Sequence, residues 1–378
     1  MKNIVLIPDS FKGTMSSTEI CDIMENAILK HYPNINITKI PVADGGEGTV
    51  DCFLQAVGGK KINLKVCNPY LKKIDSFYGL LDNDTAVIEM SAAAGLPLIE
   101  KLNPKLTSTY GVGELILDAI NKGAKKIIIG LGGSATNDCG LGCFAALGAK
   151  FFDSYMHEFI PTGGTLSRIK KIDTSMLKLN IKNIEFITMC DINNPLYGQN
   201  GAVYQFSRQK GATNEDMIIL ENEVKTFANY VKKEFDSCDV NFEGAGAAGG
   251  MGFGMKTFLN SKMQMGIDTI LDVVEFDKKL TEADLVISGE GKFDSQSFSG
   301  KVIMGIAEHT KKYSVPLIAV VGDIDDNIDS AYDRGVTAIY SINRVAKEYK
   351  DIKNRSKSDL SLTVDTIFRT VKMCENIK

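Results

Sequence analysis

The sequence contains little histidine, and its cysteines are not arranged as in a typical metal or disulfide site. The 378 residues include three histidines and eight cysteines, and no two cysteines form a C-x-x-C pair. Free thiols in a reducing cytoplasm are therefore favoured over a disulfide framework or a zinc cluster. No G-x-S-x-G sequence is present, which together with the scarce histidine argues against a serine hydrolase. The absence of G-x-x-x-x-G-K-[ST] excludes a P-loop.

A strong charge imbalance and long apolar runs are also missing. The formal net charge is −4, which gives no general electrostatic reason to bind nucleic acid or an anionic membrane. No apolar run approaches the roughly 20 residues that span a bilayer. Residues 1–10 do not resemble a secretory signal, because the apolar run 4–7 leads directly into Pro8 and Asp9. We expect a cytoplasmic monomer or homodimer that binds neither nucleic acid nor membrane.

What the sequence does contain is an alternation of short apolar runs and amphipathic segments. Its length suggests about two domains. The apolar run 4–7 is typical of a strand buried on both faces, and Ser16 with Glu19 has the spacing of a capping box at the start of a helix. We expect further strands at residues 37–42, 285–287, 317–321 and 337–341, and helices at 49–57, 302–312 and 328–334. This order predicts a mostly parallel sheet with helices on both faces.

The middle of the chain has a different pattern. Residues 77–81 and 85–90 flank a polar turn, which predicts a β-hairpin and hence antiparallel pairing. Glycine is dense in 130–148 and 244–254. We therefore predict an α/β protein of two domains. Residues 1–70 and 276–378 form a flavodoxin/Rossmann-like parallel-sheet domain, and residues 71–275 form an inserted mixed α/β domain.

Three loops that follow predicted strands carry acids, lysines and glycines. They are residues 8–14, 43–49 and 288–294. Each loop alone is also typical of a solvated turn. In a parallel sheet, however, ligands bind beyond the carboxyl ends of the strands. Glycine admits oxyanions to backbone N–H groups, lysine neutralises them, and carboxylates hold Mg²⁺, so the three loops together favour a phosphate–metal site.

The predicted inserted domain has its own glycine loop, residues 130–138, after a strand-like run. Its Gly130-x-Gly132-x-x-Ala135 pattern fits the loose dinucleotide fingerprint, and Asp153 lies about twenty residues on. The alternative function is therefore a nicotinamide-dependent 2-hydroxy-acid dehydrogenase that uses the Gly130–Ala135 loop. No histidine stands near a predicted active loop to serve its acid–base step. A glycine-rich run is also typical of close helix or loop packing.

Asp191 follows a strand-like run at residues 184–189. One interpretation makes it the Asx cap of an ordinary turn before Asn194 and Pro195. The other makes it a base that accepts a proton from a substrate hydroxyl. Lys210, beyond it, is either a surface lysine or a cation for the same site.

These motifs, in this order, resemble the glycerate kinase type-1 family. The matching segments are residues 8–13, 43–49, 130–138, 190–198, 209–212, 244–252 and 289–301. The resemblance implies transfer of the ATP γ-phosphoryl group to D-glycerate with Mg²⁺. It also implies two domains, one flavodoxin-like and one related to restriction endonucleases, and it favours 2-phosphoglycerate over 3-phosphoglycerate. The sequence departs from the family at Cys139, Cys143 and Asn193, and the last departure weakens any metal role for position 193.

For such a kinase, phosphoryl transfer in the cleft between two domains depends on positioning and charge neutralisation. Asp191 and Lys12 are the candidate catalytic residues, with Asp191 as the base. The remaining candidates fall into three sets. Those for the substrate are Asp9, Ser10, Lys12, Gly45 and Gly46; those for nucleotide phosphates are Gly132, Gly133, Ser134, Lys210 and Lys301; those for magnesium are Asp44, Glu47 and Asp294.

Overall fold

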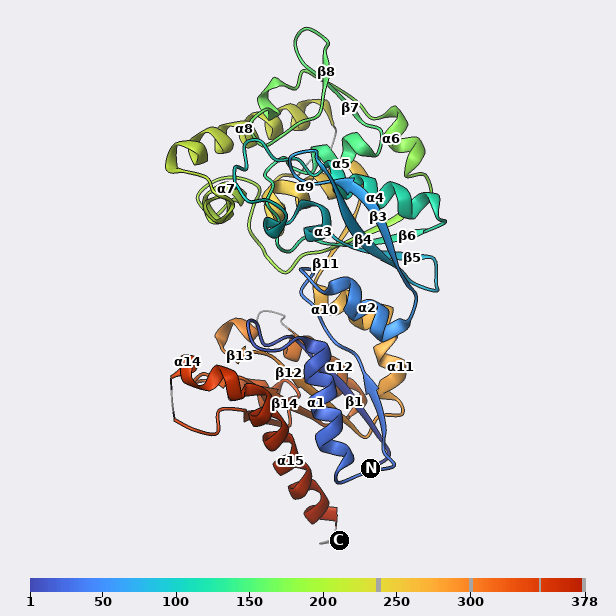
Figure 1. The fold of residues 1–378 in the computed structure, drawn as a ribbon, viewed down its shortest axis with the longest axis vertical. Coiled ribbons are helices and arrows are strands. Elements are labelled where there is room, and N and C mark those ends of the chain that lie inside the picture. The colour runs from blue at the N-terminus through green and yellow to red at the C-terminus, as the bar shows by residue number, and fades with distance from the viewer. Residues whose placement is uncertain (236–238, 299–301, 347, 376–378) are drawn as a thin grey trace. The chain divides into compact units, whose positions relative to one another are not determined.

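The computed structural model describes residues 1–235, 239–298, 302–346 and 348–375 (Figure 1). The chain forms two compact units. Unit 1 comprises residues 1–43, 55–57 and 267–378, and unit 2 comprises residues 44–54 and 58–266. Unit 1 is therefore built from both ends of the chain.

Unit 1 is built around a five-stranded parallel sheet with the order β2-β1-β12-β14-β16. Numbered along the chain, these strands have the order 2-1-3-4-5, which is that of flavodoxin-like folds. The strands are β1 (Asn3–Pro8), β2 (Asn36–Lys39), β12 (Leu285–Gly289), β14 (Leu317–Val321) and β16 (Ala338–Ser341), with a short pair β13 (Lys292–Phe293) and β15 (Asp323–Ile324). The expected parallel sheet is confirmed.

Helices cover this sheet because its central strands β1, β12 and β14 are buried on both faces. Alternate residues such as Ile4, Leu6 and Ile287 share one core with helices α1 (Ser17–Leu29) and α15 (Ser356–Glu375), which lie side by side (Figure 1). Helix α12 contacts β12 and β14. The capping box at Ser16 is present, so the expected helix start is confirmed. The other helices assigned here are α10 (Gly266–Val273), α11 (Phe276–Leu280), α12 (Val302–Tyr313), α13 (Ser330–Asp333) and α14 (Tyr349–Ile352), with the 3-10 turns η4 (Ser295–Phe298) and η5 (Lys353–Arg355).

Unit 2 contains a six-stranded mixed sheet with the order β11-β10-β6-β5-β4-β3. Strands β3 to β5 pair antiparallel and β5, β6, β10 and β11 pair parallel. These strands are β3 (Lys60–Cys67), β4 (Lys73–Leu80), β5 (Thr85–Glu89), β6 (Lys126–Gly130), β10 (Glu185–Met189) and β11 (Lys262–Gln264). The predicted hairpin before residue 90 and the mixed sheet are therefore confirmed.

One face of this sheet is covered by the large core of unit 2, to which helices α4, α5, α8 and α9 contribute. A separate antiparallel sheet has the order β8-β7-β9. The remaining elements are α2 (Thr49–Val57), α3 (Ser91–Ala94), α4 (Tyr110–Asn121), α5 (Leu141–Ala146), α6 (Ser175–Asn180), α7 (Ala202–Phe206), α8 (Asn214–Glu234), α9 (Ala247–Leu259), β7 (Lys150–Phe152), β8 (Glu158–Phe159), β9 (Lys171–Asp173), η1 (Leu96–Leu98), η2 (Leu166–Arg168) and η3 (Arg208–Lys210).

The boundaries between the two compact units differ from the expected domain boundaries at residues 70 and 275. Strand β3 lies before residue 70, yet it pairs with β4 along its whole length and therefore belongs to unit 2. Residues 44–54 also belong to unit 2. Pairing between strands decides this assignment, and the sequence pattern of β3 alone does not reveal its partner.

Candidate functional site

In unit 1, the loop after β1 lies beside the loop after β12 at the carboxyl edge of the sheet. The Asp9 amide donates to the Gly289 carbonyl (2.8 Å), and the Ser10 amide donates to the Asp9 carboxylate (2.6 Å). A Cβ atom on Gly291 would lie 3.8 Å from the amide nitrogen of Lys12. Lys12 is exposed, and Asp9 and Ser10 are half-buried. The expected substrate residues of this unit therefore share one edge, where ligands bind in open parallel sheets.

The loop after β12 contains a buried acid that the sequence motif did not single out. Glu290 is buried, and its carboxylate accepts a hydrogen bond from the Ser297 hydroxyl. That hydroxyl also accepts one from the Asp294 amide (3.2 Å), so the network holds the segment around Asp294, a predicted magnesium ligand. Lys301, predicted to bind phosphate, lies outside the described residues.

In unit 2, the ends of three parallel strands are in register. Glu89 of β5 pairs with Gly130 of β6, which pairs with Met189 of β10. A Cβ atom on Gly45 would lie 3.3 Å from the Gly130 Cα and 3.5 Å from the Met189 Cβ. The turn at Gly45 therefore lies against the carboxyl ends of β6 and β10.

The contact between the two glycine segments requires glycine on both sides. The Gly132 amide donates to the Gly45 carbonyl (3.0 Å), so this N–H group already has a partner. A Cβ atom on Gly130 would come within 2.3 Å of the Gly45 oxygen, closer than real Cβ contacts. Gly45 itself has φ +79°, a left-handed conformation that glycine adopts without strain. Gly130, Gly132 and Gly45 are thus needed for backbone packing.

The close packing of these glycines also explains why residues 130–135 fit the dinucleotide fingerprint in sequence. That fingerprint needs a helix that starts at the glycine loop, whereas α5 starts only at Leu141. The approach of Gly46 fills the space beside Gly132. Asp153, the acid about twenty residues after the glycine pattern, accepts hydrogen bonds from the Tyr155 and His157 amides in the turn between β7 and β8.

Lys210 is held inside unit 2 by the glycine loop. Its Nζ donates to the Ser134 hydroxyl (2.8 Å) and to the Thr136 carbonyl (2.6 Å), and the residue is buried. Burial lowers the pKa of Lys210 to about 7, while the negative charge of Asp138 acts in the opposite direction. The interpretation of Lys210 as a surface lysine is therefore wrong. Its two contacts fix the conformation of residues 134–136.

A second polar cluster supports the far end of the same loop. Asp138 is fully buried, and it accepts hydrogen bonds from the Thr109 amide (2.7 Å) and hydroxyl (2.8 Å) and from the Gly142 amide (3.2 Å). Burial raises the pKa of this carboxyl group. Among the described residues, neither amide atom of the buried Asn137 has a hydrogen-bond partner. Such groups in native structures are usually satisfied by water or a ligand.

The two acids of residues 44–48, the segment that precedes helix α2, are accessible. Asp44 and Glu47 are both exposed, and the Asp44 carboxylate accepts a hydrogen bond from the Gly46 amide (3.3 Å). Across the described parts of the chain, no three His, Cys, Asp or Glu side chains form a preformed metal cage. Magnesium usually takes one or two protein carboxylates together with water and phosphate oxygens. The carboxylate oxygens of Asp44 and Glu47 are therefore suitable ligands for this ion.

Asp191 is exposed two residues beyond the end of β10. One carboxylate oxygen accepts a hydrogen bond from the Gly266 amide (2.7 Å), which restricts the side chain. The preceding residue, Cys190, has its thiol pKa raised to about 11 by burial, so that thiol is not an activated nucleophile. Asp191 thus presents an exposed carboxylate at this strand end.

Glu89 is a buried acid at this edge that sequence reasoning missed. It occupies the last position of β5 and is 2% exposed. Its carboxylate accepts a hydrogen bond from the Val50 amide in the first turn of α2 (3.4 Å). The signal in the sequence was a lone acid that ends an otherwise apolar strand.

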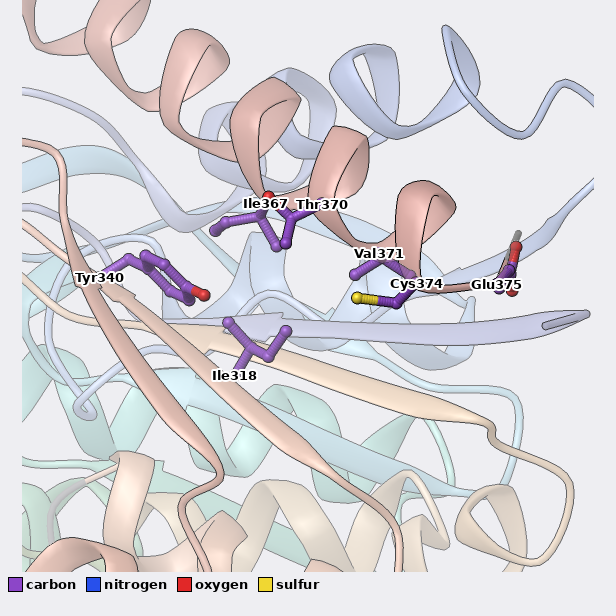
Figure 2. Close-up of a pocket in the computed structure, with 7 residues that line it drawn as sticks. All are labelled: Ile318, Tyr340, Ile367, Thr370, Val371, Cys374 and Glu375. Atoms are coloured by element: carbon purple, nitrogen blue, oxygen red, sulfur yellow. The ribbon is translucent and has the colours of Figure 1, made fainter. Parts of the chain in front are cut away.

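Unit 1 also contains an apolar pocket of about 300 Å³ away from these loops. Figure 2 shows Ile318 of β14 and Tyr340 of β16 facing residues of α15, among them Val371 and Cys374. None of the predicted site residues lines it, so it is not part of the site. None of the helices described is both long and apolar enough to cross a membrane.

Together, these features define an α/β protein with a flavodoxin-like parallel sheet in one unit, a mixed sheet in the other, and polar glycine loops at the strand ends of each. The model of the glycerate kinase family matches residues 4–372. The chain belongs to the glycerate kinase family, which is a family of kinases.

Individual relatives agree with this assignment over almost the whole chain. A glycerate kinase of Bacillus subtilis is 40% identical over 377 residues, which cover 99% of each chain. A glycerate 2-kinase of Escherichia coli is 40% identical over 342 residues, 90% of each chain. The crystal structure of a Salmonella typhimurium LT2 protein, provisionally assigned as glycerate kinase 2, matches with a TM-score of 0.88 at 34% identity and covers 99% of both chains. These findings do not support the nicotinamide-dependent dehydrogenase.

Proposed function

We propose that the chain transfers the γ-phosphoryl group of ATP to D-glycerate and forms 2-phosphoglycerate. The observation that carries this proposal is the gathering of the Gly45 turn, the 130–138 loop and Asp191 at the in-register strand ends of unit 2. Membership of the glycerate kinase family gives the reaction class. The name of the Escherichia coli relative, a glycerate 2-kinase, favours O2 as the acceptor.

The acceptor substrate needs a cation for its carboxylate and hydrogen-bonding groups for its hydroxyls. Lys12 supplies the cation, with Asp9 and Ser10 beside it on the same loop. Gly45 and Gly46 offer backbone to the substrate. A charge-assisted hydrogen bond of this kind contributes about 1.5–3 kcal/mol.

The nucleotide phosphates need neutralisation as charge moves to the leaving ADP. Gly133, Ser134 and Lys301 serve this role. Gly132 and Lys210 act by shaping the loop, since their donors contact Gly45, Ser134 and Thr136 within the protein. Asp44, Glu47 and Asp294 supply oxygen ligands for Mg²⁺, which when bound neutralises phosphate charge.

Asp191 orients the acceptor hydroxyl and takes up its proton. The hydroxyl oxygen forms a bond to the γ-phosphorus as the bond between that phosphorus and the β–γ bridging oxygen breaks. The electron pair of the broken bond leaves with ADP. The contact with the Gly266 amide keeps the base in one orientation, which is the positioning that such catalysis requires.

A phosphorus-31 NMR time course of the purified protein with ATP, Mg²⁺ and D-glycerate tests this function. We expect the ATP signals to give way to those of ADP and 2-phosphoglycerate, which its phosphorus–proton coupling distinguishes from 3-phosphoglycerate. Reactions without Mg²⁺, and with L-glycerate in place of the D-isomer, serve as controls. ATP that stays intact with D-glycerate would refute the proposal, and a 3-phosphoglycerate product would refute the assignment of O2.

A further inference from the structure

Helix α2 begins without a capping side chain of its own. Its N-cap is Gly48, with φ +89° and no side-chain hydrogen bond. The first-turn amides of a helix need acceptors when they are buried, and Val50, in that turn, is buried. The Glu89 carboxylate, reaching from β5, accepts the hydrogen bond from the Val50 amide (3.4 Å). A residue of the sheet thus takes the place of the missing cap.

The position of Glu89 ties this cap to the glycine loops. Glu89 is in register with Gly130, the residue against which Gly45 packs. On the other side of the turn, the Thr49 hydroxyl donates to the Gly46 carbonyl (2.6 Å). The segment 44–48 is therefore held at its start by the end of β6 and at its end by the first turn of α2, which Glu89 fixes.

The chemistry of this contact argues for a dedicated role. Glu89 is nearly fully buried, and this burial raises the pKa of its carboxyl group against the effect of the helix amides. The charged groups that act on it are Asp51 of α2 and Lys61 of β3, and these two form an ion pair with each other (2.8 Å). Burying an acid without a strong partner is costly, and an apolar residue would pack at this strand end without that cost.

We infer that Glu89 is a positioning residue, which holds Asp44 and Glu47 in their working places through the N-terminus of helix α2. The inference rests on the proposed function in that it assigns Mg²⁺ binding to these two acids. It adds a residue that does not touch the substrate and acts through the backbone of the loop.

Three variants at this position, with one control elsewhere in unit 2, separate positioning from general stability. Glu89→Leu removes the acceptor, Glu89→Gln keeps a side-chain oxygen, and Glu89→Asp withdraws the carboxylate by one methylene. Glu223→Leu is the matched control, because Glu223 is also a buried acid that accepts a hydrogen bond from a backbone amide, that of Ser167 (2.6 Å). The measurements are hydrogen exchange by mass spectrometry, melting temperature, and the Mg²⁺ concentration that gives half-maximal rate with ATP and D-glycerate.

For Glu89→Leu we expect exchange in residues 44–54 to accelerate about tenfold, which is the scale of a lost helix cap. The half-saturating Mg²⁺ concentration should rise by a similar factor. In Glu89→Gln, the exchange rate and the half-saturating Mg²⁺ concentration should both lie within about threefold of the wild-type values. The values for Glu89→Asp should lie between those for Glu89→Gln and Glu89→Leu. Glu223→Leu should accelerate exchange only around residues 164–170 and leave the Mg²⁺ dependence unchanged.

Two results would overturn the inference. One is a hydrogen-exchange rate in residues 44–54 that Glu89→Leu leaves unchanged. If Glu89→Leu does not fold, the exchange rate measured for Glu89→Asp decides instead. The other is an equal rise in the Mg²⁺ requirement for Glu89→Leu and Glu223→Leu at equal loss of melting temperature, which would make the role of Glu89 merely structural. A wild-type protein that does not phosphorylate glycerate would refute the proposed function instead, while the exchange data would still test the positioning.

Discussion

Gly132 and Gly46 lie against each other so closely that a Cβ atom on Gly132 would come within 2.5 Å of the Gly46 Cα. The two residues belong to loops that are far apart in the sequence, yet their backbones meet at the carboxyl edge of the unit 2 sheet. Any side chain at residue 132 would therefore push the 44–47 segment away from β6. Protein interiors are packed too densely to absorb such a shift without cost.

Gly132→Ala should lower the free energy of unfolding by about 1–3 kcal/mol, the typical cost of overpacking. It should also reduce kcat/KM for glycerate, because the displaced segment carries Asp44 and Glu47. Urea denaturation and steady-state kinetics measure the two effects. Gly291→Ala is the control for stability, since a Cβ atom there would have its nearest neighbour at 3.7 Å. Equal stability of the two variants would contradict the close packing of Gly132.

The burial of Lys210 predicts how stability depends on pH. Its pKa is about 7 in the folded protein and about 10.4 in an unfolded chain. Between these values the unfolded state binds a proton that the folded state does not, so the free energy of unfolding rises with pH. The slope from this one group approaches about 1.4 kcal/mol per pH unit within the window.

Urea denaturation of wild type and Lys210→Met between pH 6.5 and 9.5 measures this contribution. Stability of the wild type relative to the variant should increase with pH across that range. Lys178→Met, which changes an exposed lysine of the same unit, should follow the wild-type curve. Parallel curves for wild type and Lys210→Met would show that Lys210 does not titrate in this window.

Asp191→Asn should lower kcat by about 10²–10⁴, the usual effect of removing a general base. Asparagine keeps an oxygen to accept the hydrogen bond from the Gly266 amide, so folding and substrate KM should change little. Asp173→Asn is a matched control, because Asp173 also accepts a hydrogen bond from a backbone amide, that of Ser175 (2.9 Å). A variant that keeps more than about a tenth of wild-type kcat would exclude Asp191 as the base.

Lys12→Met should raise the KM for glycerate about 10- to 100-fold, because the substrate carboxylate loses a charge-assisted partner. The KM for ATP should stay close to the wild-type value. Lys312→Met provides the comparison, since Lys312 is another exposed lysine of unit 1, lies outside the predicted site loops and pairs with Asp277 (3.0 Å). Initial rates at varied glycerate and fixed saturating ATP measure both variants. If Lys12→Met and Lys312→Met give the same KM, Lys12 does not bind the carboxylate.

Much of the fold followed from local pattern. The apolar run at residues 4–7, the capping box at Ser16 and the helix at Thr49–Val57 are all present, because periodicity and capping act within a few residues. The parallel sheet followed from the alternation of strand and helix. The assignment of β3 to unit 2 did not follow, since only its pairing with β4 places it there.

The candidate site likewise has features that follow from the local sequence and features that depend on tertiary contacts. The sequence by itself determined that the glycines of residues 130–133 and Asp191 follow strands, because strand direction puts such loops at the carboxyl edge of a sheet. The segment that carries Asp44, expected beside the loops of the first sheet, belongs instead to unit 2. Only the tertiary structure decided that Gly132 serves to admit Gly46, that Lys210 is buried against Ser134, and that Glu89 caps α2. These roles depend on contacts between segments distant in sequence, and such contacts form only when the sheet and its loops pack together.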